Sequence, residues 1–139
     1  MSYDLQIFSC SEPNSELARL ATEEGFEREE NSFSLRGKNW QLLFHSADKV
    51  EPEDIPVSVF RELPGIGYLT LANIESDAPA SVRAKAIRFA KKLARASRGI
   101  LVNPQEDTIE TARGLKRVDL AKVPKEEGTL KLSWWFEGG

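Results

Sequence analysis

Cysteine and histidine are nearly absent, since this chain of 139 residues holds one of each, Cys10 and His45. A single cysteine excludes a disulfide within the chain and any zinc or iron–sulfur site that needs several thiolates. A single histidine excludes metal motifs with paired histidines and leaves at most one Ser–His or Cys–His pair for nucleophilic catalysis. The sequence also contains no glycine-rich phosphate loop. From these absences we expect a protein that is not an enzyme and that holds neither a metal nor another cofactor.

Long hydrophobic runs are missing as well. The apolar runs are only a few residues long, whereas about 20 consecutive apolar residues are needed to cross a bilayer as a helix. The segment Met1–Cys10 carries no basic residues ahead of an apolar stretch, so we expect no signal peptide. These features predict a cytoplasmic protein without a membrane partner.

The composition that remains is that of an ordinary globular protein, with 40% hydrophobic, 29% charged and 9% aromatic residues. A chain of this length buries on the order of two-thirds of its unfolded surface, which is enough for a hydrophobic core. The formal net charge is −3, and this balance argues against a protein dedicated to coating nucleic acid. We predict a single α+β domain over residues 1–139.

Two segments, 16–24 and 81–98, have the apolar periodicity of amphipathic helices. Gly25 and Gly99 follow them and suit the left-handed position that ends a helix. Residues 57–63 are ambiguous between helix and strand. Alternating apolar residues predict strands at 3–8, 32–37, 40–45, 66–74, 100–102, 108–111 and 129–136. The chain thus contains two strand–helix–strand units, an order that predicts a ferredoxin-like α/β plait, an antiparallel sheet with both helices on one face.

The helix expected at 81–98 is strongly basic. Its apolar residues fall in one arc of the helical wheel, and seven basic residues with no acidic one fill the opposite arc: Arg83, Lys85, Arg88, Lys91, Lys92, Arg95 and Arg98. The rest of the chain holds the other 12 basic residues against 22 acidic ones, so the molecule is electrically polarised. We expect Arg88, Lys91, Lys92 and Arg95 to be exposed.

Three interpretations of this basic arc stay open. The arc is a cationic face for phosphates, RNA or an acidic protein partner, or it is a solvated surface that keeps the protein soluble. In the third interpretation it pairs with acidic residues in or just after the first helix, Glu16, Glu23, Glu24 and Glu27. Such surface pairs are worth only about 0–1 kcal/mol each. The usual companions of RNA binding are missing, since no aromatic stacking pair lies in a basic strand.

The segment 129–136 carries two adjacent tryptophans, Trp134 and Trp135. Successive side chains of a strand point to opposite faces, so the two cannot both face one core. The alternatives are core packing with partial burial and a docking surface for another domain or chain, since aromatic residues are enriched in interface cores. Trp134 and Trp135 therefore join the four exposed basic residues as candidates for partner binding.

The second half of the chain carries a set of familiar segments. They are Arg-Glu-Leu-Pro-Gly-Ile-Gly-Tyr-Leu at 61–69, the alanine-rich helix, Gly-Ile-Leu-Val-Asn-Pro-Gln at 99–105, Arg-Gly-Leu-Lys-Arg at 113–117 and Leu-Ser-Trp-Trp-Phe at 132–136. The set resembles a family of uncharacterised bacterial proteins, a resemblance that implies no functional residue. In such proteins the Trp-Trp-Phe strand runs on into further sequence, so the resemblance implies a chain cut from a longer protein after Gly139, with a short natural variant as the alternative. More loosely, small acidic plaits of this kind are similar to the immunity proteins of bacterial toxin systems.

These features favour a non-catalytic protein-interaction module of a bacterium, of which an immunity-type inhibitor of a toxin is one form. Its partner is expected to be another protein or a further domain of the same chain. The first alternative is a nucleic-acid or phosphate binder that uses the basic helix 81–98. The second alternative is an enzyme that uses Cys10 or His45 with nearby carboxylates, although the spacing of these residues requires no such contact.

Overall fold

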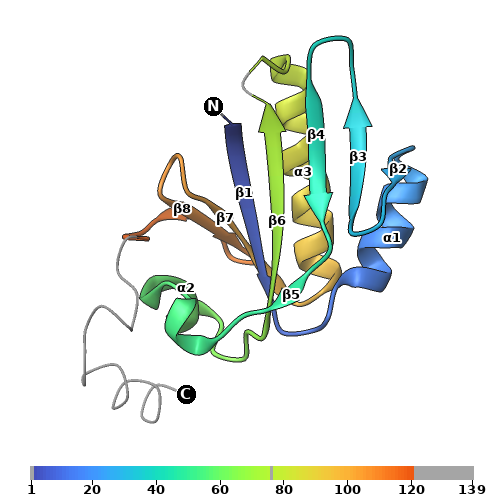
Figure 1. Ribbon diagram of the computed structural model, residues 1–139. Coiled ribbons are helices and arrows are strands. Elements are labelled where there is room, and N and C mark those ends of the chain that lie inside the picture. Colours follow the sequence, from blue (N-terminus) through green and yellow to red (C-terminus); the bar gives the residue numbers. More distant parts are fainter. Residues whose placement is uncertain (1, 76, 121–139) are drawn as a thin grey trace.

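The computed structural model describes residues 2–75 and 77–120, which form one antiparallel sheet with helices on both of its faces (Figure 1). The strands are β1 (Ser2–Ser9), β2 (Glu27–Arg28), β3 (Ser32–Arg36), β4 (Gln41–His45), β5 (Asp48–Lys49), β6 (Tyr68–Glu75), β7 (Gly99–Asn103), β8 (Thr108–Thr111) and β9 (Gly114–Arg117). The helices are α1 (Asn14–Glu23), α2 (Val57–Glu62) and α3 (Ala80–Ala96), with a short 3-10 turn at Pro52–Asp54. Among these described residues, no helix is long and apolar enough to cross a membrane.

The strands follow one another across the sheet in the order β2-β3-β4-β6-β1-β7-β8-β9, and β5 pairs with β6 beyond the end of β4. Every neighbouring pair is antiparallel. The central strand is β1, which pairs with β6 over its whole length and with β7 over its second half. The predicted α+β class with an antiparallel sheet is confirmed, but the sheet is larger than that of a ferredoxin-like plait.

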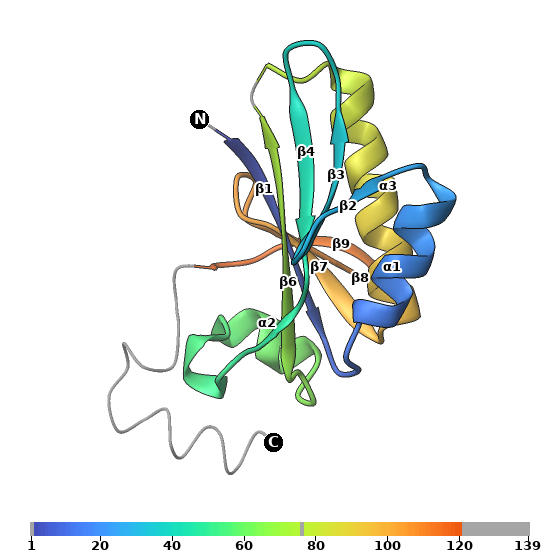
Figure 2. The same cartoon turned by 45° about the vertical axis from the view of Figure 1, so that its right-hand side comes forward.

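Two hydrophobic clusters lie on opposite faces of this sheet. Strand residues alternate between faces, so Leu5 and Ile7 of β1 belong to the first cluster while Phe8 belongs to the second. Helices α1 and α3 cover the first cluster and α2 covers the second, as Figure 2 shows. The two helices predicted from periodicity thus lie on the same face of the sheet.

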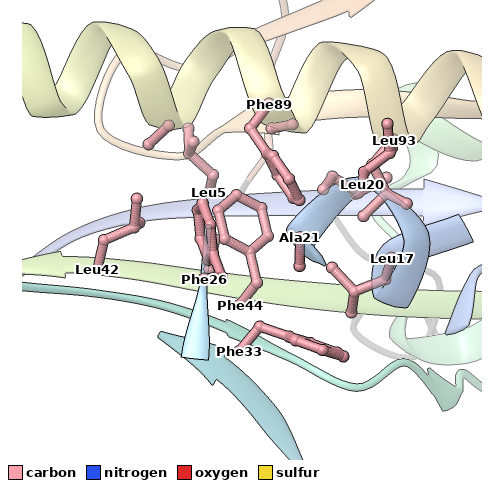
Figure 3. Close-up of a cluster of buried hydrophobic side chains, with 14 of the residues drawn as sticks. Leu5, Leu17, Leu20, Ala21, Phe26, Phe33, Leu42, Phe44, Phe89 and Leu93 are labelled. Atoms are coloured by element: carbon pink, nitrogen blue, oxygen red, sulfur yellow. The ribbon is translucent and has the colours of Figure 1, made fainter. Parts of the chain in front are cut away.

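Three phenylalanines join α1 and α3 to the sheet in the first cluster (Figure 3). Phe89 of α3 stacks on Phe26 with ring centroids 4.9 Å apart, and it meets Phe44 of β4 edge-on at 4.7 Å. Gly25, with a φ of 79°, makes the left-handed turn predicted after the first helix and brings the chain back to Phe26. Burying one such side chain is worth about 1.5–3 kcal/mol, so the three rings together fix the position of α3.

The second cluster places α2 against the other face of the sheet. It consists of Phe8, Ile55, Val59, Phe60, Ile66, Ile100, Val102 and Ile109. Pro56 and Pro64 bracket the segment whose pattern was ambiguous, so its helix has only six residues. Val118 and Leu120 pack against the same cluster, and the described part of the chain therefore ends on this face.

Candidate functional site

A cleft of about 360 Å³ lies where the C-terminal end of α3 meets the β8–β9 hairpin and the end of α2. The view in Figure 2 has β8 and β9 beside α3, and an ion pair between α3 and β8 joins them. The cleft is lined by Glu62, Leu63, Lys91, Ala94, Arg95, Arg98, Gly99, Ile100, Leu101, Glu110, Thr111, Ala112 and Arg113. These residues come from three separate segments of the chain, 62–63, 91–101 and 110–113, so only the folded protein has this site.

Four cations and two carboxylates line the cleft, and both carboxylates are already paired. The Nζ of Lys91 lies 3.2 Å from Glu110 Oε2, and Nη2 of Arg113 lies 3.9 Å from Glu62 Oε2. Lys116 of β9 also forms an ion pair with Glu62. These contacts hold the hairpin against α2 and α3. Because both carboxylates already contact cations, their negative charge repels an incoming anion less.

Arg95 and Arg98 differ from the other two cations. Both are exposed, and neither forms an ion pair with another of the described residues. A guanidinium group offers a planar fork of donors that matches the two oxygens of a carboxylate or phosphate. Cations near a helix C-terminus also stabilise the helix by complementing its dipole, which is the structural role that this pair would have without a ligand.

The backbone of Arg98 adopts a left-handed conformation with a φ of 58°. The prediction that Gly99 takes this position at the end of α3 is wrong by one residue. Gly99 is needed for another reason, because a Cβ there would lie 2.6 Å from the carbonyl oxygen of Phe8. The left-handed region costs a residue with a Cβ roughly 1–2 kcal/mol, so Arg98, which lines the cleft, carries some backbone strain.

The structure divides the predicted basic arc of α3 into two sides. Arg88, Lys92 and Arg95 are exposed, but Lys91 is only half-exposed because it pairs with Glu110. On the side facing α1, the Nζ atoms of Lys85 and Lys92 lie 3.7 and 3.4 Å from the carboxylate of Glu24. Of the acidic residues proposed to pair across the helices, Glu24 does so, whereas Glu16 and Glu23 pair with Arg19 in their own helix.

Arg113 and Glu62 are site residues that the sequence analysis missed. Arg113 lies in the two-residue turn between β8 and β9, and a short Thr-Ala-Arg-Gly turn before a basic strand was the available signal. Nothing in the local sequence places Glu62 beside that turn. The predicted strand 129–136, with Trp134 and Trp135, lies outside the described residues.

His45 and Cys10, the residues of the enzyme alternative, have separate surroundings. The amide Nδ2 of Asn73 donates a hydrogen bond to Asp4 Oδ1 at 2.7 Å. The Oδ1 of Asn73 therefore faces His45 and accepts a hydrogen bond from His45 Nε2 at 2.9 Å. Cys10 lies beyond the end of β1, next to Gly65. Within the part of the chain that the structure describes, no hydrogen bond joins His45 to Cys10, and no group of three or more metal-ligating side chains is present.

No family model, curated protein or solved structure matches the chain. The chemistry of the cleft is therefore the basis for a functional assignment. Its lining combines apolar residues, among them Leu63, Ile100 and Leu101, with the guanidinium-bearing residues Arg95, Arg98 and Arg113. This arrangement suits a ligand that carries both negative charge and apolar surface.

Proposed function

We propose that the chain is a non-catalytic, cytoplasmic protein-interaction module whose cleft binds an acidic, partly apolar segment of another protein or of a further domain of the same chain. The observation that carries the proposal is the position of Arg95 and Arg98, which form no ion pair with other described residues, beside apolar lining residues of the cleft. Guanidinium and carboxylate groups form strong bidentate hydrogen bonds, and burying an apolar side chain of the partner against the apolar lining residues contributes favourable free energy.

The dimensions of the cleft support an anchoring role. Ligand pockets in proteins have volumes of roughly 300–1,000 Å³, and the volume of about 360 Å³ found here lies at the small end of that range. A space of this size takes one or two side chains of a partner rather than a large cofactor. Arginine is also among the residues that supply most of the binding free energy at protein interfaces.

An immunity-type inhibitor of a bacterial toxin is the finer form of this proposal. Such a protein needs no catalytic groups of its own, and it has to recognise one partner surface. The polarised charge of the chain supports this form. Co-expression with a candidate toxin encoded beside the gene tests it, since the chain should protect the host cell and its Arg95→Glu variant should not.

We also propose that a ferredoxin-like plait lies within the larger sheet. The chain runs from β1 through α1 to β4, and β6 lies between these two strands. It runs from β6 through α3 to β7, and β1 lies between those two. The two strand–helix–strand units therefore interleave, with both helices on one face of the sheet. Strands β2, β3, β5, β8 and β9 then extend this core. An experimental structure with a different order of the four central strands would contradict it.

Binding of nucleic acid or phosphate through the basic helix is the second candidate function. Arg88 and Arg95 of α3 and Arg98 just after it support this function, because they form no ion pairs with other described residues. Three of the remaining cations of the helix already contact carboxylates, namely Lys85, Lys91 and Lys92. This pairing reduces the positive field and makes the protein partner the better supported choice.

A binding measurement separates the two functions. The probes are a fluorescein-labelled peptide of alternating glutamate and leucine and a labelled single-stranded RNA of mixed sequence, followed by fluorescence anisotropy. We expect the peptide to bind and the double variant Arg95→Gln with Arg98→Gln to weaken it at least about tenfold, a loss of about 1.4 kcal/mol. The matched control, Lys85→Gln with Lys92→Gln, removes the same charge from the side facing α1 and should keep its affinity.

The same measurement has two outcomes against the proposal. Tighter binding of the RNA, with a steep fall in affinity as salt rises, would show that phosphate contacts dominate and would favour the second function. Equal affinity of the peptide for both double variants would show that Arg95 and Arg98 are not the binding residues. Failure of the peptide to bind at all would also contradict the proposed function.

A further inference from the structure

Strand β9 forms one edge of the sheet. Gly114–Arg117 pairs with β8 on one side, and no other strand of the described residues lies on its other side. All four of its residues are exposed. An edge strand presents a row of backbone N–H and C=O groups that can pair with another extended chain.

The pairing with β8 shows which backbone groups of β9 face outward. The N–H of Val118 donates to the carbonyl of Asp107 at 2.9 Å, and Lys116 is the register partner of Ile109. Backbone groups of alternate residues point to the same side of an antiparallel strand. The N–H and C=O groups of Leu115 and Arg117 therefore point away from β8, toward the open edge.

The side chains of β9 match the chemistry of the cleft. Leu115 is 63% exposed, and its register partner across the strands is Glu110, which lines the cleft. Leu115 and Glu110 point to the same face because they are directly opposite one another. The edge thus adds a large exposed apolar side chain on the face of the sheet to which Glu110 points.

The charge of this edge selects the occupant. Arg113, Lys116 and Arg117 lie in or next to β9, and Arg113 and Lys116 share a single carboxylate, that of Glu62. A second copy of the chain paired along β9 would set these cations against their own equivalents, and like charges that face each other across strands are destabilising. An acidic extended segment of a different protein avoids this repulsion and gains charge-assisted contacts instead.

We infer that the partner segment of the proposed function binds as an additional β-strand along β9, with its backbone on the N–H and C=O groups of Leu115 and Arg117. This inference rests on the proposed function and adds the binding mode to it. Main-chain hydrogen bonds supply affinity in such strand addition, and side-chain pockets supply specificity. The cleft would take acidic or apolar side chains from one face of the added strand, since alternate residues of a strand share a face.

Amide hydrogen exchange measured by NMR on the full chain is the first test. Without peptide, the amides of Leu115 and Arg117 should exchange fast, while those of Lys116 and Val118 should be protected by β8. The glutamate–leucine peptide should slow the exchange of Leu115 and Arg117 at least about tenfold. Slow exchange of these two amides in the free chain would show that a second copy or residues 121–139 already occupy the edge, and would overturn the inference.

Modified peptides supply the second test and leave the protein unchanged. N-methyl groups are placed on alternate residues of the peptide, in both registers. Strand addition predicts that methylation in one register abolishes binding, since only one set of peptide N–H groups faces β9, while the other register keeps it. If both methylated peptides bind like the unmodified peptide while Arg95→Gln with Arg98→Gln still loses it, the strand inference fails and the proposed function stands. If the unmodified peptide does not bind, both fail.

A pair of protein variants completes the design. Arg117→Pro removes an outward N–H that β8 does not use, a position where an edge strand tolerates proline. Arg117→Gln removes the same charge and keeps the N–H, so it is the matched control. We expect the proline variant to bind the peptide at least about tenfold more weakly than the glutamine variant, and equal affinities would overturn the inference.

Discussion

The carbonyl oxygen of Arg98 accepts a hydrogen bond from the backbone N–H of Cys10 at 3.1 Å, which ties the turn after α3 to the end of β1. The neighbouring N–H of Ser11 donates to the carbonyl of Ser97 at 3.2 Å. These two bonds hold Arg98 in its left-handed conformation. The backbone just after β1 therefore fixes the turn that carries Arg98, and no ion pair with another described residue does so.

Replacing Arg98 with glycine separates stability from binding. Glycine adopts the left-handed region without the steric cost of a Cβ, although it loses more conformational entropy on folding. We expect Arg98→Gly to leave the free energy of unfolding unchanged or to raise it by up to about 1 kcal/mol, while binding of the acidic peptide weakens. Urea denaturation and fluorescence anisotropy measure the two quantities. A loss of stability would show that the arginine side chain stabilises the fold, and that ligand binding at the cleft does not explain an arginine at this position.

Adding one methyl group to Gly99 should destabilise the protein. The new Cβ would lie 2.6 Å from the carbonyl oxygen of Phe8, so β1 and β7 would have to move apart. We expect Gly99→Ala to lower the free energy of unfolding by about 1–3 kcal/mol, the usual cost of overpacking. Gly67→Ala is the control, since a Cβ at Gly67 meets no atom within 4 Å. Thermal melting of both variants checks this, and equal melting temperatures would contradict the close approach.

Charge reversals on α3 distinguish the two sides of its basic arc. Lys85→Glu with Lys92→Glu would place two more carboxylates beside Glu24, and we expect a loss of about 1 kcal/mol because each surface pair contributes about 0–1 kcal/mol. Arg88→Glu with Arg95→Glu breaks no ion pair between described residues, so its stability should stay within about 0.5 kcal/mol.

The two double variants should also differ in binding, since Arg95 lines the cleft and Lys85 and Lys92 do not. The Arg88 and Arg95 reversal should abolish peptide binding, and the Lys85 and Lys92 reversal should leave it in place. Fluorescence anisotropy with the glutamate–leucine peptide compares their binding, and chemical denaturation at low and high salt compares their stability. A larger loss of stability in the Arg88 and Arg95 variant would mean that the arc is structural.

Much of the secondary structure follows from local pattern. The helices α1 and α3 lie within two residues of the predicted segments, because each carries an apolar stripe at helical spacing. Strands β2, β5 and β9 were not predicted. They have only two to four exposed residues each, so their sequences carry no alternation between a buried and an exposed face.

The candidate site was predictable only in part. Lys91 and Arg95 were among the residues proposed for partner binding, because an entire helix face without an acidic residue is visible in the sequence. The pairing of Lys91 with Glu110 and the position of Glu62 depend on contacts between segments far apart in the chain. A single sequence contains no signal for such contacts, so the cleft itself emerges only from the fold.

The central position of β1 has a consequence for the order of folding. This strand leaves the ribosome well before both of its neighbours, since Ser2 pairs with Glu75 and Ser9 pairs with Gly99. Contacts of such large sequence separation give a high contact order, which slows folding because long loops must close first. During synthesis the apolar residues Leu5, Ile7 and Phe8 cannot be buried in the sheet until β6 and β7 are made. The nascent chain therefore exposes this strand to chaperones, and to aggregation, until β6 and β7 have emerged.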